Sequence, residues 1–385
     1  MNLLLLGIGF RNMGAELMLR AIRDHFQARD ADTTLSTPAT GTFAQRGAYG
    51  LYTLLPRGRW GRSRMASALM PPSFRRSYGL TAESDVEAIL DASGFAYSDQ
   101  WGAANSRMML ENSRRWKAAG KKIILLPQAF GPFQNPDVRE ATRGLLDLAD
   151  LVFARDEASM KHLAVLNLNT AALKAPDFTG PVAGRFPEEF QARQPYACVA
   201  PNVRMLDKTD RRISTAYRDF LAHAIRAIRA KGLQVLVTTH EGGEDETLGR
   251  ELVRESDEGV RQGNLGDVAA EKGVLGNAEF IVGSRFHHLV SGLVQGVPCL
   301  GAGWSHKYDE LFAGYGCPEW LVSLSEGEAM WKQALDRALD PAQRQALRPR
   351  LQAAARTVQA ETERMWDQVD QVLFTDEQGR SSLPC

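Results

Sequence analysis

Hydrophobic positions follow two alternating periods along almost the whole chain. In the first half, short apolar runs predict strands near residues 2–7, 33–37, 86–92, 122–127 and 151–154. Helical patterns fall between most of these runs. The first of them, near 13–27, predicts one apolar helix face made of Leu17, Met18, Ala21, Ile22 and Phe26. Strands that alternate with helices are typical of βαβ units, so we expect an α/β fold with parallel sheets.

A break in both periods divides the chain. Residues 176–195, PDFTGPVAGRFPEEFQARQP, are rich in proline and glycine. Afterwards the alternation restarts with a predicted strand at 196–200, an amphipathic helix, a second strand in LQVLVTTH and a helix near 244–255. We therefore predict two Rossmann-like domains, residues 1–185 and 195–340, with a cleft between them at the carboxyl ends of the strands.

Two segments stand apart from this alternation. Residues 40–81 fit neither period and are dense in Gly, Pro and Arg, so they are read as a long, mobile excursion. Residues 341–385 form a third predicted region. Apolar side chains recur there at helical spacing as far as Leu373, which predicts a helical tail that packs back on the body or on a second subunit.

Composition narrows the class of protein. A chain of 385 residues is longer than one hydrophobic core usually fills, which agrees with two domains. Its 46 basic and 46 acidic residues balance, which argues against a nucleic-acid groove. The four cysteines form no paired motif, so neither a zinc site nor a disulfide framework is predicted, and a reducing cytoplasm is the expected compartment.

The apolar start of the chain, MNLLLLGIGF, reads as a buried strand. It is short, and it lacks the basic region and the small-residue cleavage site of a signal peptide. No later run reaches the roughly 18 apolar residues that a membrane-spanning helix needs. Any contact with a membrane is therefore expected to be peripheral.

The clearest candidate for chemistry is the stretch IVGSRFHHLVSGLVQGVPCL at residues 281–300. A strand feeds a helix there, Ser284 is a predicted N-cap, and the first turn of the helix would attract an anion. Arg285 adds a planar cationic fork, and His287 adds a group that titrates near neutral pH. Taken alone, the pattern is equally typical of packing histidines and a surface ion pair, and His288 is read as structural.

Other ionisable residues follow neighbouring predicted strands. Arg204 comes after one strand, His240, Glu241 and Asp245 come after the next, and Lys307 follows a later one. Because the carboxyl ends of parallel strands meet at one sheet edge, these groups are expected to converge with Arg285. Clustered cations of this kind favour an anion site.

The first half offers weaker signals. The turn GIGFRNMGAE at residues 7–16 suggests a dinucleotide site, but Asn12 occupies the third glycine position and no acidic residue ends the second strand, so nicotinamide binding is not predicted. Gln128 and Arg155 each follow a predicted strand, in LLPQAFGPF and ARDEASMKHL. Arg155 with Asp156 is equally well read as a capping pair.

Taken together, these motifs resemble the polysaccharide pyruvyltransferase family. The resemblance rests on RNMGAELMLRAI, LLPQAFGPF, ARDEASMKHL, APDF and VGSRFHHLVSGLVQGVPCLG with Lys307 following, all in the family's order. It covers residues 2 to about 316. It implies a fold similar to the GT-B glycosyltransferases and transfer of pyruvate from phosphoenolpyruvate (PEP) to a saccharide as a ketal.

The resemblance also implies roles for individual residues. The donor would be bound by Arg204, Ser284, Arg285, Phe286 and Lys307. His287 would act as the general acid or would deprotonate the acceptor, with His240 and Glu241 as second candidates. Asn12, Gln128 and Arg155 would lie on the acceptor side. PEP is then a co-substrate, no cofactor is expected, and no metal is required, although Glu241 and Asp245 are groups that recruit one.

Two alternatives remain open at this stage. One is a GT-B glycosyltransferase in which Arg285 and Lys307 clamp the diphosphate of a nucleotide sugar. The other is a non-catalytic carbohydrate-binding homologue that keeps the fold. For the pyruvyltransferase, the expected partner is a saccharide or a lipid-linked oligosaccharide at the inner face of the membrane. Self-association into a homo-oligomer is a further expectation, and nucleic acid is not an expected partner.

Overall fold

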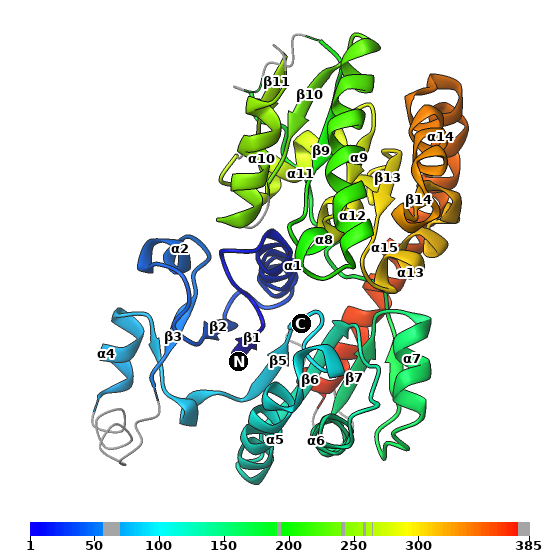
Figure 1. The fold of residues 1–385 in the computed structure, drawn as a ribbon. Helices are drawn as coiled ribbons and strands as arrows, with labels where there is room; N and C mark the ends of the chain where they lie inside the picture. Colours follow the sequence, from blue (N-terminus) through cyan, green and yellow to red (C-terminus); the bar gives the residue numbers. More distant parts are fainter. Residues whose placement is uncertain are drawn as a thin grey trace. The chain divides into compact units, whose positions relative to one another are not determined.

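The computed structural model describes residues 1–56, 70–188, 190, 194–239, 243–256, 259–263 and 265–375. The chain forms two compact units, each built on its own sheet (Figure 1). Unit 1 holds residues 1–10, 18–178 and those from 361 onward, and unit 2 holds residues 11–17 and 179–360. The units therefore divide at 178/179, and two helices, α1 (Met13–Arg29) and α15 (Pro341–Phe374), contribute to both.

Unit 1 is built on an eight-stranded sheet in the order β4-β3-β2-β1-β5-β6-β7-β8, and every pairing is parallel. Its strands are β1 (Asn2–Leu6), β2 (Thr34–Thr37), β3 (Tyr52–Leu54), β4 (Leu80–Thr81), β5 (Ala88–Asp91), β6 (Lys122–Gln128), β7 (Leu151–Ala154) and β8 (Ala172–Lys174). Its helices besides α1 are α2 (Phe43–Ala48), α4 (Pro72–Ser77), α5 (Ala103–Ala118), α6 (Pro136–Leu146) and α7 (Glu157–Ala164).

The predicted strands of the first half are confirmed, and all of them except β2 are apolar runs buried on both faces, as is typical of parallel sheets; β2 has the sequence TLST. Leu3, Leu4 and Leu5 of β1 are fully buried, and α1 buries the predicted apolar face. Helices α5 and α6 pack side by side (Figure 1). They cover a core that includes Met109, Trp116 and Val138.

The reading of residues 40–81 as an excursion was wrong for the described part. Strands β3 and β4 lie in this segment and extend the sheet beyond β2, and helices α2 and α4 precede them. These strands have three and two residues, which is too short to show a period of two in the sequence. Residues 57–69 lie outside the described residues.

Unit 2 is built on a six-stranded parallel sheet in the order β11-β10-β9-β12-β13-β14. Its strands are β9 (Tyr196–Ala200), β10 (Gln234–Val237), β11 (Val260–Gln262), β12 (Ile281–Gly283), β13 (Cys299–Ala302) and β14 (Leu321–Val322). Its helices are α8 (Arg204–Asp207), α9 (Arg211–Ala230), α10 (Glu244–Arg254), α11 (Val268–Gly276), α12 (Phe286–Val294), α13 (Lys307–Gly314) and α14 (Glu328–Leu339).

The long helix α15 carries the predicted apolar stripe. Leu347 and Leu351 are buried in the part that belongs to unit 2, and Met365, Val369 and Leu373 in the part that belongs to unit 1. Within unit 1, Asp370 pairs with His25 of α1 at 2.9 Å. None of the helices in the described residues, α15 included, is long and apolar enough to cross a membrane.

Candidate active site

The candidate site of unit 2 begins where the order of its strands reverses. The chain runs outward from β9 to β11, then returns to β12 on the other side of β9. Gly283 of β12 is paired with Ala200 of β9, so the turns that follow these strands leave the sheet side by side. Ligands in open α/β folds bind at this reversal point. The turns carry Arg204 and Arg285, as the sequence predicted.

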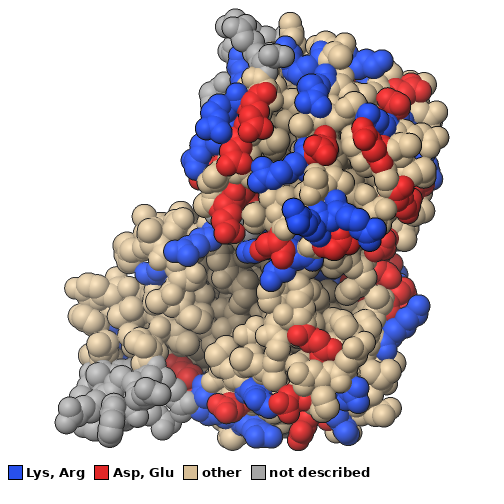
Figure 2. All heavy atoms as spheres, viewed as in Figure 1, with Lys and Arg blue, Asp and Glu red and all other residues tan. Residues whose placement is uncertain are grey.

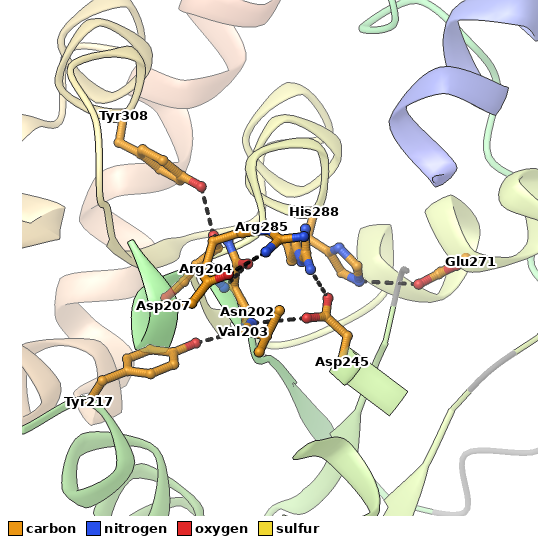
Figure 3. Close-up of polar contacts among 11 residues, drawn as sticks. Asn202, Val203, Arg204, Asp207, Tyr217, Asp245, Glu271, Arg285, His288 and Tyr308 are labelled. Atoms are coloured by element: carbon orange, nitrogen blue, oxygen red, sulfur yellow. Dashed lines mark hydrogen bonds and ion pairs between the residues drawn. The ribbon is translucent and has the colours of Figure 1, made fainter. Parts of the chain in front are cut away.

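A buried polar network fixes the two turns to each other (Figure 3). The side-chain amide of Asn202 donates to the Ser284 carbonyl at 2.6 Å, and the Tyr308 hydroxyl donates to the same carbonyl at 2.7 Å. The Asn202 backbone N–H donates to the Tyr217 hydroxyl at 2.8 Å. Burial raises the pKa of both tyrosines well above the usual value, so their hydroxyl groups stay protonated even in mildly alkaline solution.

The start of α12 differs from the prediction by one residue. Arg285, not Ser284, is the N-cap, and it makes no side-chain capping hydrogen bond. Ser284 is instead fully buried, and its backbone N–H bonds the Ala200 carbonyl at 3.0 Å, which continues the strand pairing. The prediction of Ser284 as N-cap was wrong because strand pairing extends to this residue. The first turn of α12 still begins next to the Arg285 side chain.

Arg285 forms an ion pair with Asp245, the second residue of α10 (Figure 3). Asp245 is 1% exposed and Arg285 8% exposed, so neither charge is well solvated. The other carboxylate oxygen of Asp245 accepts the Val203 backbone N–H at 2.9 Å. One carboxylate therefore holds both the guanidinium of Arg285 and the turn that carries Arg204.

Arg204 lies in a more open position. It starts the short helix α8, its backbone N–H donates to the Asn202 side chain at 2.9 Å, and its guanidinium pairs with Asp207. About a third of the Arg204 side chain is exposed, at 36%. An exposed pair of this kind is weak and readily exchanged for another anion. The backbone of Arg204 is thus fixed while its charged end is able to turn to a ligand.

His287 lies in the first turn of α12 and packs against the first turn of α1. A Cβ added to Gly14 would lie 2.1 Å from Nδ1 of His287 and 2.3 Å from its Cε1. Both residues belong to unit 2. The His287 ring therefore fits in this position only because Gly14 has no side chain. The RNMGAE and SRFHH motifs are in contact here.

Replacing Gly14 by alanine is expected to lower the melting temperature by several degrees. In a helix this change normally stabilises by about 1 kcal/mol, but here the added methyl group would overlap the His287 ring, and overpacking costs about 1–3 kcal/mol. Gly314→Ala in α13 is the matched control, because nothing lies within 4 Å of a Cβ at that position. The melting temperatures of both variants are measured by thermal unfolding. A Gly14→Ala variant that is as stable as Gly314→Ala would contradict the proposed contact between Gly14 and His287.

His288 points into the interior. Its Nε2 atom lies 3.1 Å from a carboxylate oxygen of Glu271 on α11, and its side chain is fully buried (Figure 3). The adjacent histidines thus differ in surroundings: His287 is partly exposed and His288 is not. This burial agrees with the structural reading of His288.

Lys307 begins α13, after β13, and its ammonium group lies over three aromatic rings. The Nζ atom is 4.8 Å from the ring centre of Trp304, 5.3 Å from that of Phe286 and 5.5 Å from that of Tyr308. Aromatic faces attract cations at such distances. Since Phe286 follows Arg285 and Tyr308 bonds to Ser284, the position of Lys307 is tied to the same turn.

The other predicted residues have varied surroundings. The Asn12 side chain accepts the Ala15 backbone N–H at 3.3 Å at the start of α1. Gln128 is fully buried at the end of β6, with its Nε2 atom 3.5 Å from a carboxylate oxygen of Asp91. Arg155 forms an ion pair of 3.3 Å with Asp177 of the APDF motif, and both side chains are nearly buried. Gln128 and Arg155 thus contact other residues of unit 1.

Two predicted catalytic candidates, His240 and Glu241, lie outside the described residues. Within the described part of the chain, no group of three or more His, Cys, Asp or Glu side chains is arranged to hold a metal ion. Asp245, which the sequence suggested as a group that recruits one, faces Arg285 instead. In this structure the Asp245 carboxylate is the counter-ion of Arg285.

Sequence reasoning missed several residues that shape this site. Tyr217 and Tyr308 lie on helices whose apolar pattern marks them only as core, so their hydroxyl contacts had no sequence signal. Gly14 was read only as part of a glycine-rich turn. Asp245 was among the ionisable residues expected near Arg285, but its ion pair with Arg285 was not predicted, because its position in the first helical turn after a strand is one that many capping residues share.

Comparisons with known proteins define first the class of fold. The chain is similar to the UDP-GlcNAc 2-epimerase of Neisseria meningitidis bound to UDP-GlcNAc, with a TM-score of 0.57, 8% identity and coverage of 94% of this chain and 100% of that one. It is also similar to Staphylococcus aureus MnaA in a co-structure with UDP, with a TM-score of 0.59, 11% identity and coverage of 100% and 99%. A third similar structure is Phytolacca americana UGT2, complexed with UDP-2-fluoro-glucose and pterostilbene. Its TM-score is 0.55 and its identity 10%, with coverage of 97% of this chain and 99% of that one. The fold is therefore the two-domain α/β fold of GT-B glycosyltransferases and epimerases, as predicted.

The family follows from the sequence. A model of the polysaccharide pyruvyl transferase family matches residues 12–306, so the chain belongs to this family and is a transferase. No curated protein matches the chain in sequence. The matched span includes Arg204, Arg285, His287 and Asp245 of the candidate site, and it ends one residue before Lys307.

Proposed function

We propose that the protein transfers the pyruvyl group of PEP onto a saccharide acceptor as a ketal, in the biosynthesis of a cell-surface polysaccharide. The observation that carries this proposal is the meeting of Arg204 and Arg285 at the reversal point of the unit 2 sheet. Both belong to the part of the chain that matches the family model. We assign the donor site to this edge.

The charges at this edge suit PEP. The donor carries a phosphate group and a carboxylate on the same carbon, and planar guanidinium groups bind both kinds of anion through paired hydrogen bonds. Arg285 has five N–H donors, so it can hold Asp245 and a ligand together. Helix α12 adds the positive end of its dipole beside Arg285.

The reaction needs proton transfer as well as anion binding. A proton is added to the terminal methylene carbon of PEP, which leaves a cationic carbon next to the carboxylate. Two hydroxyl groups of the acceptor then form C–O bonds to that carbon as its bond to the phosphate oxygen breaks. The two hydroxyl groups together lose two protons. One of these balances the proton that was added to the methylene carbon, and the other goes to the released phosphate or to solvent.

We assign the protonation of the methylene carbon to His287. It lies two residues after Arg285, in the first turn of α12, and Gly14 restricts its ring. An imidazole is the side chain best suited to give a proton near neutral pH. His287 is also a candidate for deprotonating the acceptor, and His240 and Glu241 are the second candidates for both roles.

The acceptor side is proposed for unit 1. We propose that the acceptor is a saccharide or a lipid-linked oligosaccharide, and that the protein is a cytoplasmic enzyme in peripheral contact with the inner face of the membrane.

The experiment that tests the proposed function is to incubate the purified protein with PEP and a panel of saccharides. Phosphate release that depends on a saccharide, with an acid-labile pyruvyl adduct by mass spectrometry, is expected. Transfer from a nucleotide sugar, with none from PEP, would contradict the proposal.

A further inference from the structure

A pocket of about 650 Å³ lies in unit 1. Its lining residues come from the carboxyl ends of β1, β2, β3 and β5 and from α5 as far as its last turn. Its walls are mainly apolar and include Leu6, Leu54, Leu55, Met108, Met109 and Trp116. This volume is in the range of roughly 300–1,000 Å³ that small-molecule sites occupy.

One end of the pocket is the point where the strand order of unit 1 reverses, between β1 and β5. Gly7 follows β1 with a φ of +74°, and a Cβ there would lie 2.4 Å from Ser93 Cα in the turn after β5. The two turns approach closely because Gly7 has no side chain. The pocket thus opens from the edge of the sheet where α/β folds bind ligands.

The acidic and basic side chains that line the pocket form hydrogen bonds with neighbouring residues. The Asp91 carboxylate accepts hydrogen bonds from the Tyr97 hydroxyl at 2.7 Å and from the Ser93 hydroxyl at 2.5 Å. Arg115 makes two hydrogen bonds to Glu83, at 2.9 and 3.2 Å. The positive and negative charges of that pair cancel, and Asp91 is fully buried behind its partners. The lining therefore suits an uncharged ligand.

The exposed wall of the pocket is apolar. Met108 on α5 is 61% exposed, and the proline and alanine after β2, Pro38 and Ala39, are exposed too. Flexible methionine side chains adapt to irregular hydrocarbon surfaces. Around β3 and α2 the surface of unit 1 carries few charged side chains (Figure 2). An extended apolar wall that leads away from the sheet edge suits a hydrocarbon chain better than it suits a compact polar sugar ring.

We propose that this pocket binds a hydrocarbon chain carried by the saccharide acceptor, so that the saccharide lies at the carboxyl edge of the unit 1 sheet. This inference rests on the proposed function for the existence of a saccharide acceptor. The donor site does not enter it, because every lining residue of the pocket belongs to unit 1.

The test is binding of methyl, butyl and octyl glucosides to the full chain, each below its micelle-forming concentration and without PEP. Burial of each methylene group is expected to tighten binding about three- to fourfold until the pocket is filled. Met108→Glu places a charge on the wall and is expected to lower the octyl-to-methyl affinity ratio at least about tenfold. Val165→Glu is the matched control, since Val165 is another exposed apolar residue of unit 1, at 64%, that does not line the pocket.

Ala39→Trp, a change at an exposed rim position, is a second variant expected to lower the same ratio if Met108→Glu proves unstable. Affinity that does not grow with chain length would overturn the proposal. So would chain-length dependence that both pocket variants retain, or that Val165→Glu loses equally. A separate PEP titration distinguishes the two proposals: normal PEP binding with no chain dependence refutes only the pocket, and chain dependence without PEP binding refutes only the donor.

Discussion

Arg285→Ala is expected to abolish detectable binding of PEP, with a loss of at least about a hundredfold in affinity. Each charge-assisted hydrogen bond to an anion contributes about 1.5–3 kcal/mol, and a guanidinium supplies two to one anionic group. The truncation also leaves the Asp245 carboxylate without its partner, at 1% exposure and beside the place proposed for the donor. Its negative charge would then repel PEP. Isothermal calorimetry measures the loss directly.

The control for this variant is Arg250→Ala. Arg250 lies on α10 of the same unit and pairs with Glu246 at 2.8 Å, with 56% of its side chain exposed. Removing it lowers the net charge by the same amount as removing Arg285, so a general electrostatic effect would appear in both variants. Affinity within about twofold of the wild type for Arg285→Ala would contradict the assignment of the donor site.

Asp245→Asn is expected to weaken PEP binding about tenfold and to lower the melting temperature by several degrees. The amide oxygen can still accept the Val203 backbone N–H, but it no longer balances the charge of Arg285. A buried arginine without its counter-ion is destabilising, and its guanidinium loses its fixed position. Thermal unfolding and calorimetry of the same preparation measure the two effects.

The matched variant is Asp207→Asn, which breaks the exposed pair with Arg204 and is expected to leave the melting temperature almost unchanged. Because Arg285→Ala leaves no PEP binding to measure, the coupling of the pair is read from stability: adding Asp245→Asn to Arg285→Ala should lower the melting temperature by less than Asp245→Asn lowers that of the wild type. An unchanged or tighter affinity for PEP in the single Asp245→Asn variant would show that the pair does not position the arginine.

Most of the sheet framework could be predicted from the sequence because its strands are central and parallel. Strands such as β1 and β9 are apolar on both faces and stand out between amphipathic helices. Their order along the chain also placed Arg204, Arg285 and Lys307 after strands of one sheet. Strands β3 and β4 were missed because so short a run carries no readable period.

The details of the candidate site were harder to predict because they depend on contacts between distant segments. Nothing local in SRFHH indicates that Gly14, more than 270 positions earlier, lies against His287. Likewise, the pairing of Asp245 with Arg285 depends on how α10 docks beside the reversal point. Helix α12 starts one residue later than predicted because the Ser284 backbone N–H pairs with the neighbouring strand β9, which is a tertiary interaction.

The central claim is that the edge of the unit 2 sheet binds PEP. Its most direct test is a calorimetric titration of the wild-type protein with PEP and, in parallel, with a nucleotide sugar such as UDP-GlcNAc. The account predicts saturable heat with PEP that Arg204→Ala and Arg285→Ala both remove, and none with the nucleotide sugar. Heat with UDP-GlcNAc but not with PEP would contradict it and would identify a nucleotide-sugar donor instead.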